Sequence, residues 1–242
     1  MYSTAVQTLA VIPAHDEAET LADVVKEIRT GQPGLEILVV DDASTDGSGE
    51  LVSRLGVRWL QLTQHIGLGG AMRAGLRYAR MLGFEAVLRL DADGQHCVEH
   101  AETMLAPLES GEADAVVGSR FSRPSGYRNS WPRAVVHRAL ALCLSQLVRR
   151  KVTDPTSGFW AFGPRALRLL GDHHPRGFSE PELLLFLARN RLRVVEVPVS
   201  MRARQGGSPS LTIAHALLAL ARTGLAMMIV PLRSKVSRKR HA

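Results

Sequence analysis

Apolar runs of strand length alternate with helical patterns along the first half of the chain, and each run ends at a polar segment. Strands that are apolar throughout are typical of parallel sheets covered by helices on both faces. The pattern therefore predicts an α/β fold with a Rossmann-like, mostly parallel sheet in one domain, residues 1–207. The predicted strands cover residues 8–13, 36–41, 57–62, 86–90 and 114–118, with helices after the first two and over 68–82.

Polar segments follow Val40, Leu90 and Val117, where three of these strands end. In open parallel sheets, ligands bind beside the carboxyl ends of the strands. We therefore expect the functional site at this edge of the sheet. Before the first helix, Asp16 with Glu19 three positions later matches a capping box, so Asp16 is predicted to cap that helix.

The segment Asp91-Ala92-Asp93 is the strongest chemical signal at that edge. In extended backbone, side chains two residues apart point the same way, so Asp91, Asp93 and Gln95 are placed to bind one cation. Carboxylate and amide oxygens suit Mg²⁺ or Mn²⁺, which proteins bind together with substrate phosphates. Such an ion would neutralise a diphosphate leaving group. The structural alternative is an Asp-x-Asp turn with no ligand.

Two other site types fit the sequence less well. A calcium loop would place its ligands at Asp91, Asp93, Gln95 and Glu102. However, His96 stands where that loop needs glycine. A dinucleotide fold would use Gly67-Leu68-Gly69, which follows a strand and opens a helix, but Met72 occupies the next required glycine position. These glycines are instead expected to let the helix pack close to the sheet or to a ligand.

The formal net charge of +7 favours anionic partners. Nucleic acid is disfavoured, because mid-chain arginines are scattered and only 5% of residues are aromatic. Two lone cysteines, Cys97 and Cys143, form neither a disulfide framework nor a metal motif and suit a reducing compartment. The N-terminus lacks the pattern of a signal peptide, which predicts a cytoplasmic location.

Residues 208–242 are predicted to form a separate C-terminal segment. Its apolar run over 211–232 has the length of a bilayer core but contains His215 and Arg222. A charge at the centre of a span costs roughly 2.5–3.5 kcal/mol, which favours an interfacial helix followed by the basic tail 233–241. This predicts a protein held peripherally at the inner face of the cell membrane. A helix packed on the domain is the alternative.

Taken in order, several segments resemble family-2 glycosyltransferases of the GT-A fold, particularly the dolichyl- or polyprenyl-phosphate sugar synthases. The match spans most of the chain before residue 211. Its segments are residues 11–17, 39–47, 67–71, 91–96, 118–121, 154–159 and 196–199.

On the donor side, the resemblance implies that the nucleotide lies near Pro13, His15, Glu17, Val40 and Asp42. Carboxylates such as Glu17 and Asp42 accept hydrogen bonds from base N–H groups and ribose hydroxyls. For Asp42, a turn or helix-start role is the structural alternative. The resemblance further implies that Asp91, Ala92, Asp93 and Gln95 hold the metal and the donor diphosphate.

On the acceptor side, the resemblance places Arg120 on the acceptor phosphate, where a guanidinium can donate two hydrogen bonds. Arg133 and His137 have the spacing of a second phosphate-binding pair, although the family often has serine at the position of His137. Near the C-terminal loop the family's lysine is missing, and Arg202 or Arg204 could compensate on the donor phosphate, with Arg204 the better-placed match. Taken alone, Arg133 and His137 would be ordinary helix residues.

The implied activity is inverting transfer of a hexose from a nucleotide sugar, of the GDP-mannose or UDP-glucose type, to a polyprenyl or dolichyl phosphate. An ionised acceptor phosphate needs no strong general base. Transfer to a hydroxyl of a glycan or lipid is the alternative, with Glu180 or Glu182 as base. A non-catalytic nucleotide-sugar-binding protein is a second alternative, and a membrane-protein partner or homo-oligomer remains open.

Overall fold

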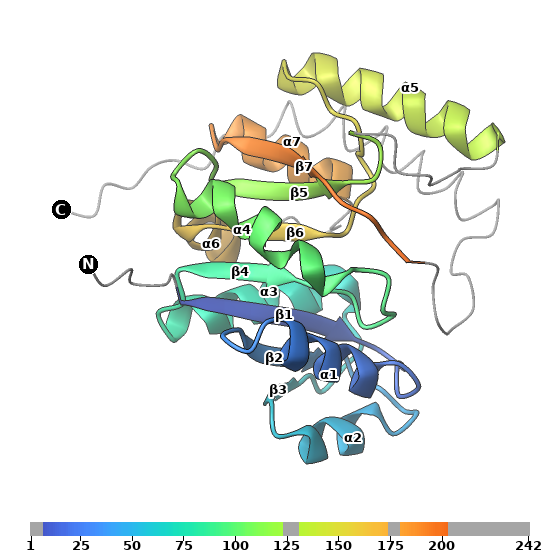
Figure 1. The fold of residues 1–242 in the computed structure, drawn as a ribbon, viewed down its shortest axis with the longest axis vertical. Coiled ribbons are helices and arrows are strands. Elements are labelled where there is room, and N and C mark those ends of the chain that lie inside the picture. Colours follow the sequence, from blue (N-terminus) through green and yellow to red (C-terminus); the bar gives the residue numbers. More distant parts are fainter. Residues whose placement is uncertain (1–6, 123–130, 174–179, 203–242) are drawn as a thin grey trace.

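The computed structural model describes residues 7–122, 131–173 and 180–202. Its strands form one seven-stranded sheet in the order β3-β2-β1-β4-β6-β5-β7 (Figure 1). The strands are β1 (Thr8–Ala14), β2 (Glu36–Asp41), β3 (Arg58–Gln61), β4 (Ala86–Arg89), β5 (Ala115–Ser119), β6 (Trp160–Phe162) and β7 (Val194–Pro198). The helices are α1 (Leu21–Gly31), α2 (Ser48–Leu55), α3 (Gly67–Met81), η1 (Val98–His100), α4 (Ala101–Glu109), α5 (Trp131–Val148), α6 (Pro164–His173) and α7 (Glu180–Arg189).

The five strands predicted from the apolar runs are confirmed, with ends that differ by at most one residue from the prediction. All strand pairs are parallel except those of β6, which runs antiparallel to both β4 and β5. The mostly parallel sheet is therefore confirmed, while β6 was not predicted. Its run of three residues is too short to give a clear periodic signal.

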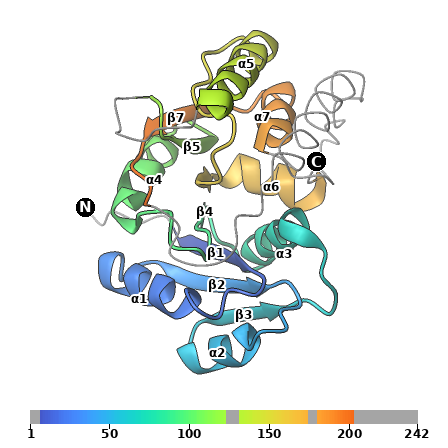
Figure 2. The same cartoon turned by 90° about the vertical axis from the view of Figure 1, so that its right-hand side faces the viewer.

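Helices cover both faces of the sheet (Figure 2). Along β1, Leu9 and Val11 pack into the core beneath α3, α6 and α7, whereas Ala10 and Ile12 pack into the core beneath α1 and α4. This alternation follows from the two-residue period of a strand. Because both faces are covered, ligands have access mainly at the edges where the strands end.

A close approach of α3 to the sheet depends on glycine. A Cβ atom at Gly75 would lie 2.6 Å from Cγ1 of Val11 in β1. The sequence interpretation gave this packing role to the glycines at 67–69, upstream of the residue that makes the contact. Gly67 instead has a φ of +76° at the start of α3, a backbone conformation that residues with a side chain rarely adopt.

The prediction that Asp16 caps the first helix is wrong. The helix begins at Leu21 after Thr20, and no side chain caps it. Asp16 has a φ of 54°, and its Oδ1 accepts a hydrogen bond of 2.7 Å from the backbone N–H of Thr45. A contact between the loops after β1 and β2 therefore replaced the local capping interaction that the sequence suggested.

The predicted C-terminal segment 208–242 and Arg204 lie outside the described residues. In the described parts of the chain, no helix is both long and apolar enough to cross a membrane.

Candidate active site

Strand β1 is parallel to β2 and β4, and β4 and β5 both run antiparallel to β6, so the loops after β1, β2, β4 and β5 leave the same edge of the sheet. The loop after β4 carries the acidic motif (residues 91–95), and the loop after β5 begins with Arg120. An isolated bridge between His96 and Met201 joins the first of these loops to the segment after β7. The predicted location of the site is thus supported by where the motifs lie.

Asp42 is buried at the start of the loop after β2, and its carboxylate contacts the loop after β3. Its Oδ1 accepts a hydrogen bond of 2.8 Å from the N–H of Ile66, and its Oδ2 lies 3.0 Å from Nδ1 of His65. The rings of His15 and His65 are in contact, with centroids 3.9 Å apart, and Nδ1 of His15 lies 2.9 Å from the carbonyl oxygen of Asp42. His65 therefore lies against the predicted donor-side residues His15 and Asp42, and Asp42 is anchored to the start of α3.

The remaining predicted donor-side residues lie in or beside β1 and β2. Pro13 and Val40 face each other in the parallel register of these strands, and both are buried. Glu17 donates its backbone N–H to Oγ of Ser48 at 3.0 Å and accepts a side-chain hydrogen bond from Thr20. These contacts tie the two loops together, so they give the nucleotide side a fixed backbone framework.

Asp91, in the loop after β4, is ion-paired with Arg89, the last residue of that strand. Nε of Arg89 donates to Oδ1 of Asp91 at 2.9 Å, and Nη2 donates to Oδ2 at 3.3 Å. Ala92 is buried, and Oδ1 of Asp93 accepts a hydrogen bond of 3.1 Å from the N–H of Gln95. Among the described residues, no group of three or more His, Cys, Asp and Glu side chains is arranged to hold a metal. The predicted ligands Asp91, Asp93 and Gln95 are not a group of that kind, because they comprise two carboxylates and one amide.

His96 shapes the turn that follows Asp91. The N–H of Asp91 donates to Nδ1 of His96 at 3.0 Å, and the imidazole ring stacks on Phe159 with centroids 4.7 Å apart. Burial lowers the pKa of His96, so its ring is neutral near pH 7 with the hydrogen on Nε2. The residue that argued against a calcium loop is therefore a structural part of the acidic motif.

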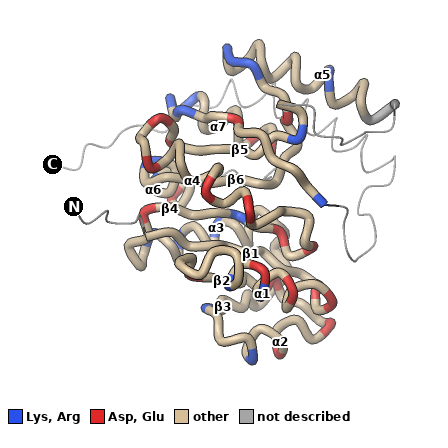
Figure 3. The backbone as a smooth tube through the Cα atoms, in the orientation of Figure 1, with Lys and Arg blue, Asp and Glu red and all other residues tan. Residues whose placement is uncertain are grey.

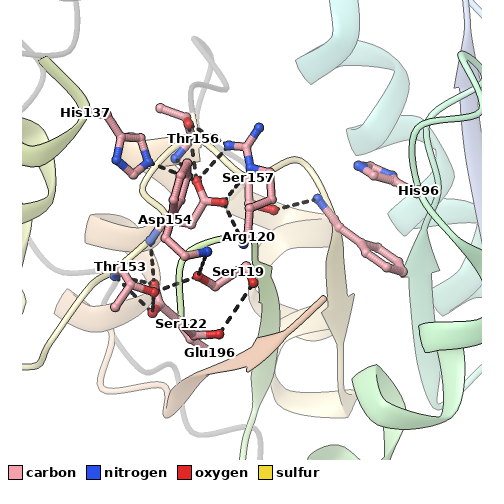
Figure 4. Close-up of polar contacts among 12 residues, drawn as sticks. His96, Ser119, Arg120, Ser122, His137, Thr153, Asp154, Thr156, Ser157 and Glu196 are labelled. Carbon is pink, nitrogen blue, oxygen red and sulfur yellow. Dashed lines mark hydrogen bonds and ion pairs between the residues drawn. The ribbon is translucent and has the colours of Figure 1, made fainter. Parts of the chain in front are cut away.

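Arg120 and His137 meet on one buried carboxylate, that of Asp154 (Figure 4). Nε and Nη2 of Arg120 donate to Asp154 at 2.7 and 2.8 Å, and Nε2 of His137 lies 3.3 Å from Oδ1. Burial by itself would raise the pKa of the Asp154 carboxyl group. The hydrogen bonds from Arg120 and His137 outweigh that effect and hold the pKa far below its ordinary value.

This geometry refines the predicted phosphate contact of Arg120. The edge of the guanidinium formed by Nε and Nη2 binds Asp154, and Nη2 also donates to Oγ1 of Thr156 at 2.9 Å. A phosphate would therefore meet another edge of the guanidinium or displace Asp154. Carboxylate and phosphate compete for the same planar fork, which is why the sequence alone could not distinguish them.

The structure brings together only part of the predicted acceptor group. His137 reaches Asp154 from α5, and Arg133 lies four residues earlier in the first turn of that helix. The side chain of Arg133 is outside the described part of the structure. Helix α5 carries basic residues but no acidic ones (Figure 3).

Asp154 and Glu196 are two residues of this cluster to which the sequence analysis assigned no role. The carboxylate of Glu196, on β7, accepts hydrogen bonds from the N–H groups of Thr153 and Asp154, at 2.8 and 3.1 Å. It thereby fixes the loop that holds Arg120. Both residues lie in segments that carried the family resemblance, which was the available signal.

Comparisons with known proteins agree with this geometry. The sequence profile of glycosyl transferase family 2 matches residues 9–170. The chain is 31% identical to an undecaprenyl-phosphate mannosyltransferase of Micrococcus luteus over 95% of the chain and 99% of that protein. It is 30% identical to a polyprenol monophosphomannose synthase of Mycolicibacterium smegmatis, over 90% of the chain and 87% of that protein.

Solved structures confirm the predicted fold. Glucosyl-3-phosphoglycerate synthase from Mycobacterium tuberculosis, crystallised with Mn²⁺ and UDP-glucose, has a TM-score of 0.67 at 22% identity. The match covers 93% of this chain and 79% of that one. At this identity the likeness establishes the GT-A fold, and the profile match and the relatives establish the family. The chain belongs to glycosyltransferase family 2.

Proposed function

We propose that this protein transfers a hexose from a nucleotide sugar to a polyprenyl phosphate, with inversion at the anomeric carbon. The observation that carries the proposal is the Arg120–Asp154–His137 cluster at the end of β5, beside the loop of the acidic motif. Under this proposal the cluster holds the acceptor anion and the acidic motif holds a cation. The two relatives described above, which act on undecaprenyl or polyprenol phosphate by name, support a lipid phosphate as the anion.

Asp91, Asp93 and Gln95 fit Mg²⁺ or Mn²⁺. Their oxygens are hard ligands, they follow a strand end, and all three side chains are partly exposed at the edge of the sheet. When bound, the ion would neutralise the diphosphate as it leaves. The hydrogen bond from the N–H of Gln95 to Asp93 already folds the loop so that both residues lie on one turn.

The acceptor needs orientation more than deprotonation. The second pKa of a phosphate monoester is about 6, so its oxygen is largely ionised near neutral pH. Arg120 and His137 would hold this anion, while Asp154 and Glu196 keep Arg120 and its loop in place. Alignment of the phosphate oxygen with the anomeric carbon then supplies the main catalytic effect.

Transfer to a hydroxyl is the second candidate, favoured by one observation. His137 is oriented by a buried carboxylate, which is also how proteins orient a general base. Glu180 fits that role less well than the sequence suggested, because its Oε1 lies 3.4 Å from Nη1 of Arg89. Burial raises the pKa of Glu180 against the effect of Arg89, and a raised pKa by itself would favour a base, so the contact with Arg89 is the argument against this role.

The proposal extends to the cell membrane. A polyprenyl phosphate is held in a bilayer, so the enzyme must work at its surface, and the apolar run 211–232 with the basic tail 233–241 has the composition of an interfacial segment. Flotation with liposomes tests this directly. Unchanged association of a chain that ends at Gly207 would remove the segment from the proposal.

A transfer assay decides between the acceptors. Purified protein is given radiolabelled GDP-mannose or UDP-glucose with undecaprenyl phosphate, undecaprenol or no acceptor, in Mn²⁺, Mg²⁺ or chelator. We expect a lipid-linked product only with the phosphate and only with a divalent ion. Product with undecaprenol at a similar rate would support the hydroxyl acceptor, and no product with any donor and acceptor pair would contradict the proposed reaction. The Arg120→Ala variant should raise the KM for the lipid phosphate much more than that for the donor.

A further inference from the structure

The last residue of β4 is an arginine with almost no exposed surface. Arg89 is 1% exposed, in a strand whose other residues are Ala86, Val87 and Leu88. A buried guanidinium is costly unless carboxylates or other acceptors compensate its charge. Its partners therefore show why this strand contains a charge.

The first partner is the acidic motif itself. Two nitrogen atoms of Arg89, Nε and Nη2, donate to the two carboxylate oxygens of Asp91. A two-point contact of this kind fixes the rotation of a carboxylate as well as its position. Because Arg89 is held by the sheet, Asp91 is held in turn.

The second partner comes from the other end of the fold. Nη1 of Arg89 lies 3.4 Å from Oε1 of Glu180, in the first turn of α7, and the two residues are separated by 91 positions in the sequence. All three nitrogen atoms of the guanidinium thus face a carboxylate. Arg89 links the acidic motif to α7.

The loop after Asp154 closes over this ion pair because it has a glycine there. A Cβ atom at Gly158 would lie 2.9 Å from Nη2 of Arg89 and 3.0 Å from Oδ2 of Asp91. Any side chain at this position would push the pair apart. The loop that binds Arg120 through Asp154 therefore also encloses the donor-side pair.

We propose that Arg89 and Glu180 are positioning residues that hold the Asp91 carboxylate in one orientation for the cation and the donor diphosphate. The inference rests on the proposed function, since it assigns Asp91 to that ion. Residues that orient metal ligands typically change metal affinity or activity by about 10–100-fold when they are removed.

The direction of the change in Mn²⁺ affinity distinguishes a positioning role of Arg89 from a purely electrostatic one. Arg89 is a cation near the bound ion, so loss of its charge alone would tighten Mn²⁺ binding. Loss of a positioning contact would weaken it, because Asp91 must then be ordered when the ion binds. The Arg89→Lys variant keeps the charge but not the two-point contact, so under our proposal it should behave like Arg89→Met.

The test measures Mn²⁺ binding by electron paramagnetic resonance and hexose transfer in Arg89→Met, Arg89→Lys, Asp91→Asn and the double variant Arg89→Met/Asp91→Asn. We expect Arg89→Met to weaken Mn²⁺ binding and lower kcat by about tenfold each. In the Asp91→Asn background, the same change should alter both by less than about twofold, since coupled residues are not additive. Arg165→Met, which removes the 3.0 Å ion pair with Asp114 at the opposite edge of the sheet, is the matched control and should leave both unchanged.

Tighter Mn²⁺ binding in Arg89→Met, full activity in Arg89→Lys, or independent losses in the double variant would each overturn the proposal. If Arg89→Met does not fold, Glu180→Gln serves in its place: it leaves the Asp91 contact but removes the anchor. We expect it to weaken Mn²⁺ binding by about tenfold, the lower end of that range, and unchanged binding would overturn the role of Glu180. Absence of Mn²⁺ binding by the unaltered protein would instead refute the metal-dependent function.

Discussion

Replacement of Asp154 by asparagine tests the cluster on which the acceptor side depends. Asparagine keeps the shape of the side chain but removes its charge, so one buried oxygen must serve Arg120, His137 and Thr156. The Asp154 side chain has no exposed surface, whereas that of Arg120 is 15% exposed. Removing one partner of a fully buried pair costs about 3–5 kcal/mol, and a charge-assisted hydrogen bond contributes about 1.5–3 kcal/mol.

Because Arg120 keeps some contact with water and asparagine keeps one acceptor, we expect a loss of about 3 kcal/mol in the free energy of unfolding. For a chain of this size, that corresponds to a fall of about 6–12 °C in Tm. Thermal unfolding followed by circular dichroism measures it. Asp172→Asn, which removes a surface ion pair with Arg80, is the control and should change Tm by less than about 2 °C.

The pH dependence of this difference gives a second check. The folded-state pKa of Asp154 is depressed, so its contribution to stability is present above the unfolded value, about 3.9, and is lost as the pH falls through the folded value. The difference in Tm between the unaltered protein and the Asp154→Asn variant should therefore be constant from about pH 5 to 8 and shrink below about pH 4. A difference in Tm that grows as the pH falls would refute the reasoning. So would a Tm of Asp154→Asn equal to that of the Asp172→Asn control.

Three further predictions concern single positions. Asp93→Ala should lower kcat at least about 100-fold and abolish the Mn²⁺ dependence of donor hydrolysis; full activity would exclude it as a ligand. His137→Ala should raise the KM for lipid phosphate while a nucleotide diphosphate still binds normally by calorimetry, and a loss of nucleotide binding would contradict its place on the acceptor side. Gly75→Ala should cost about 1–3 kcal/mol by urea unfolding, because the new Cβ would meet Val11; no change would show that α3 can move away from the sheet.

The strands and the family could be predicted from patterns of residues close together in the sequence. Runs of apolar residues identified five strands, because their signal depends only on neighbours in the sequence. The ordered motifs, among them residues 39–47 and 91–96, predicted the family, and the strand ends predicted where the site lies. Asp91, Asp93 and Gln95 were predicted from the two-residue step of extended chain, but residues 92–94 form a turn after β4, so that step does not hold there and the ligand set stays a prediction.

Long-range packing decided the rest. Asp154 binds Arg120 from 34 residues away, and Glu180 reaches Arg89 across 91, because chain crossovers bring their loops to the same edge of the sheet. No periodic pattern in the sequence predicts these long-range contacts. Residue patterns along the chain were enough to predict which segments form the sheet and which motifs stand at its edge. Which carboxylate neutralises which arginine could be read only from the folded protein, since it depends on distances between groups that are far apart in the sequence.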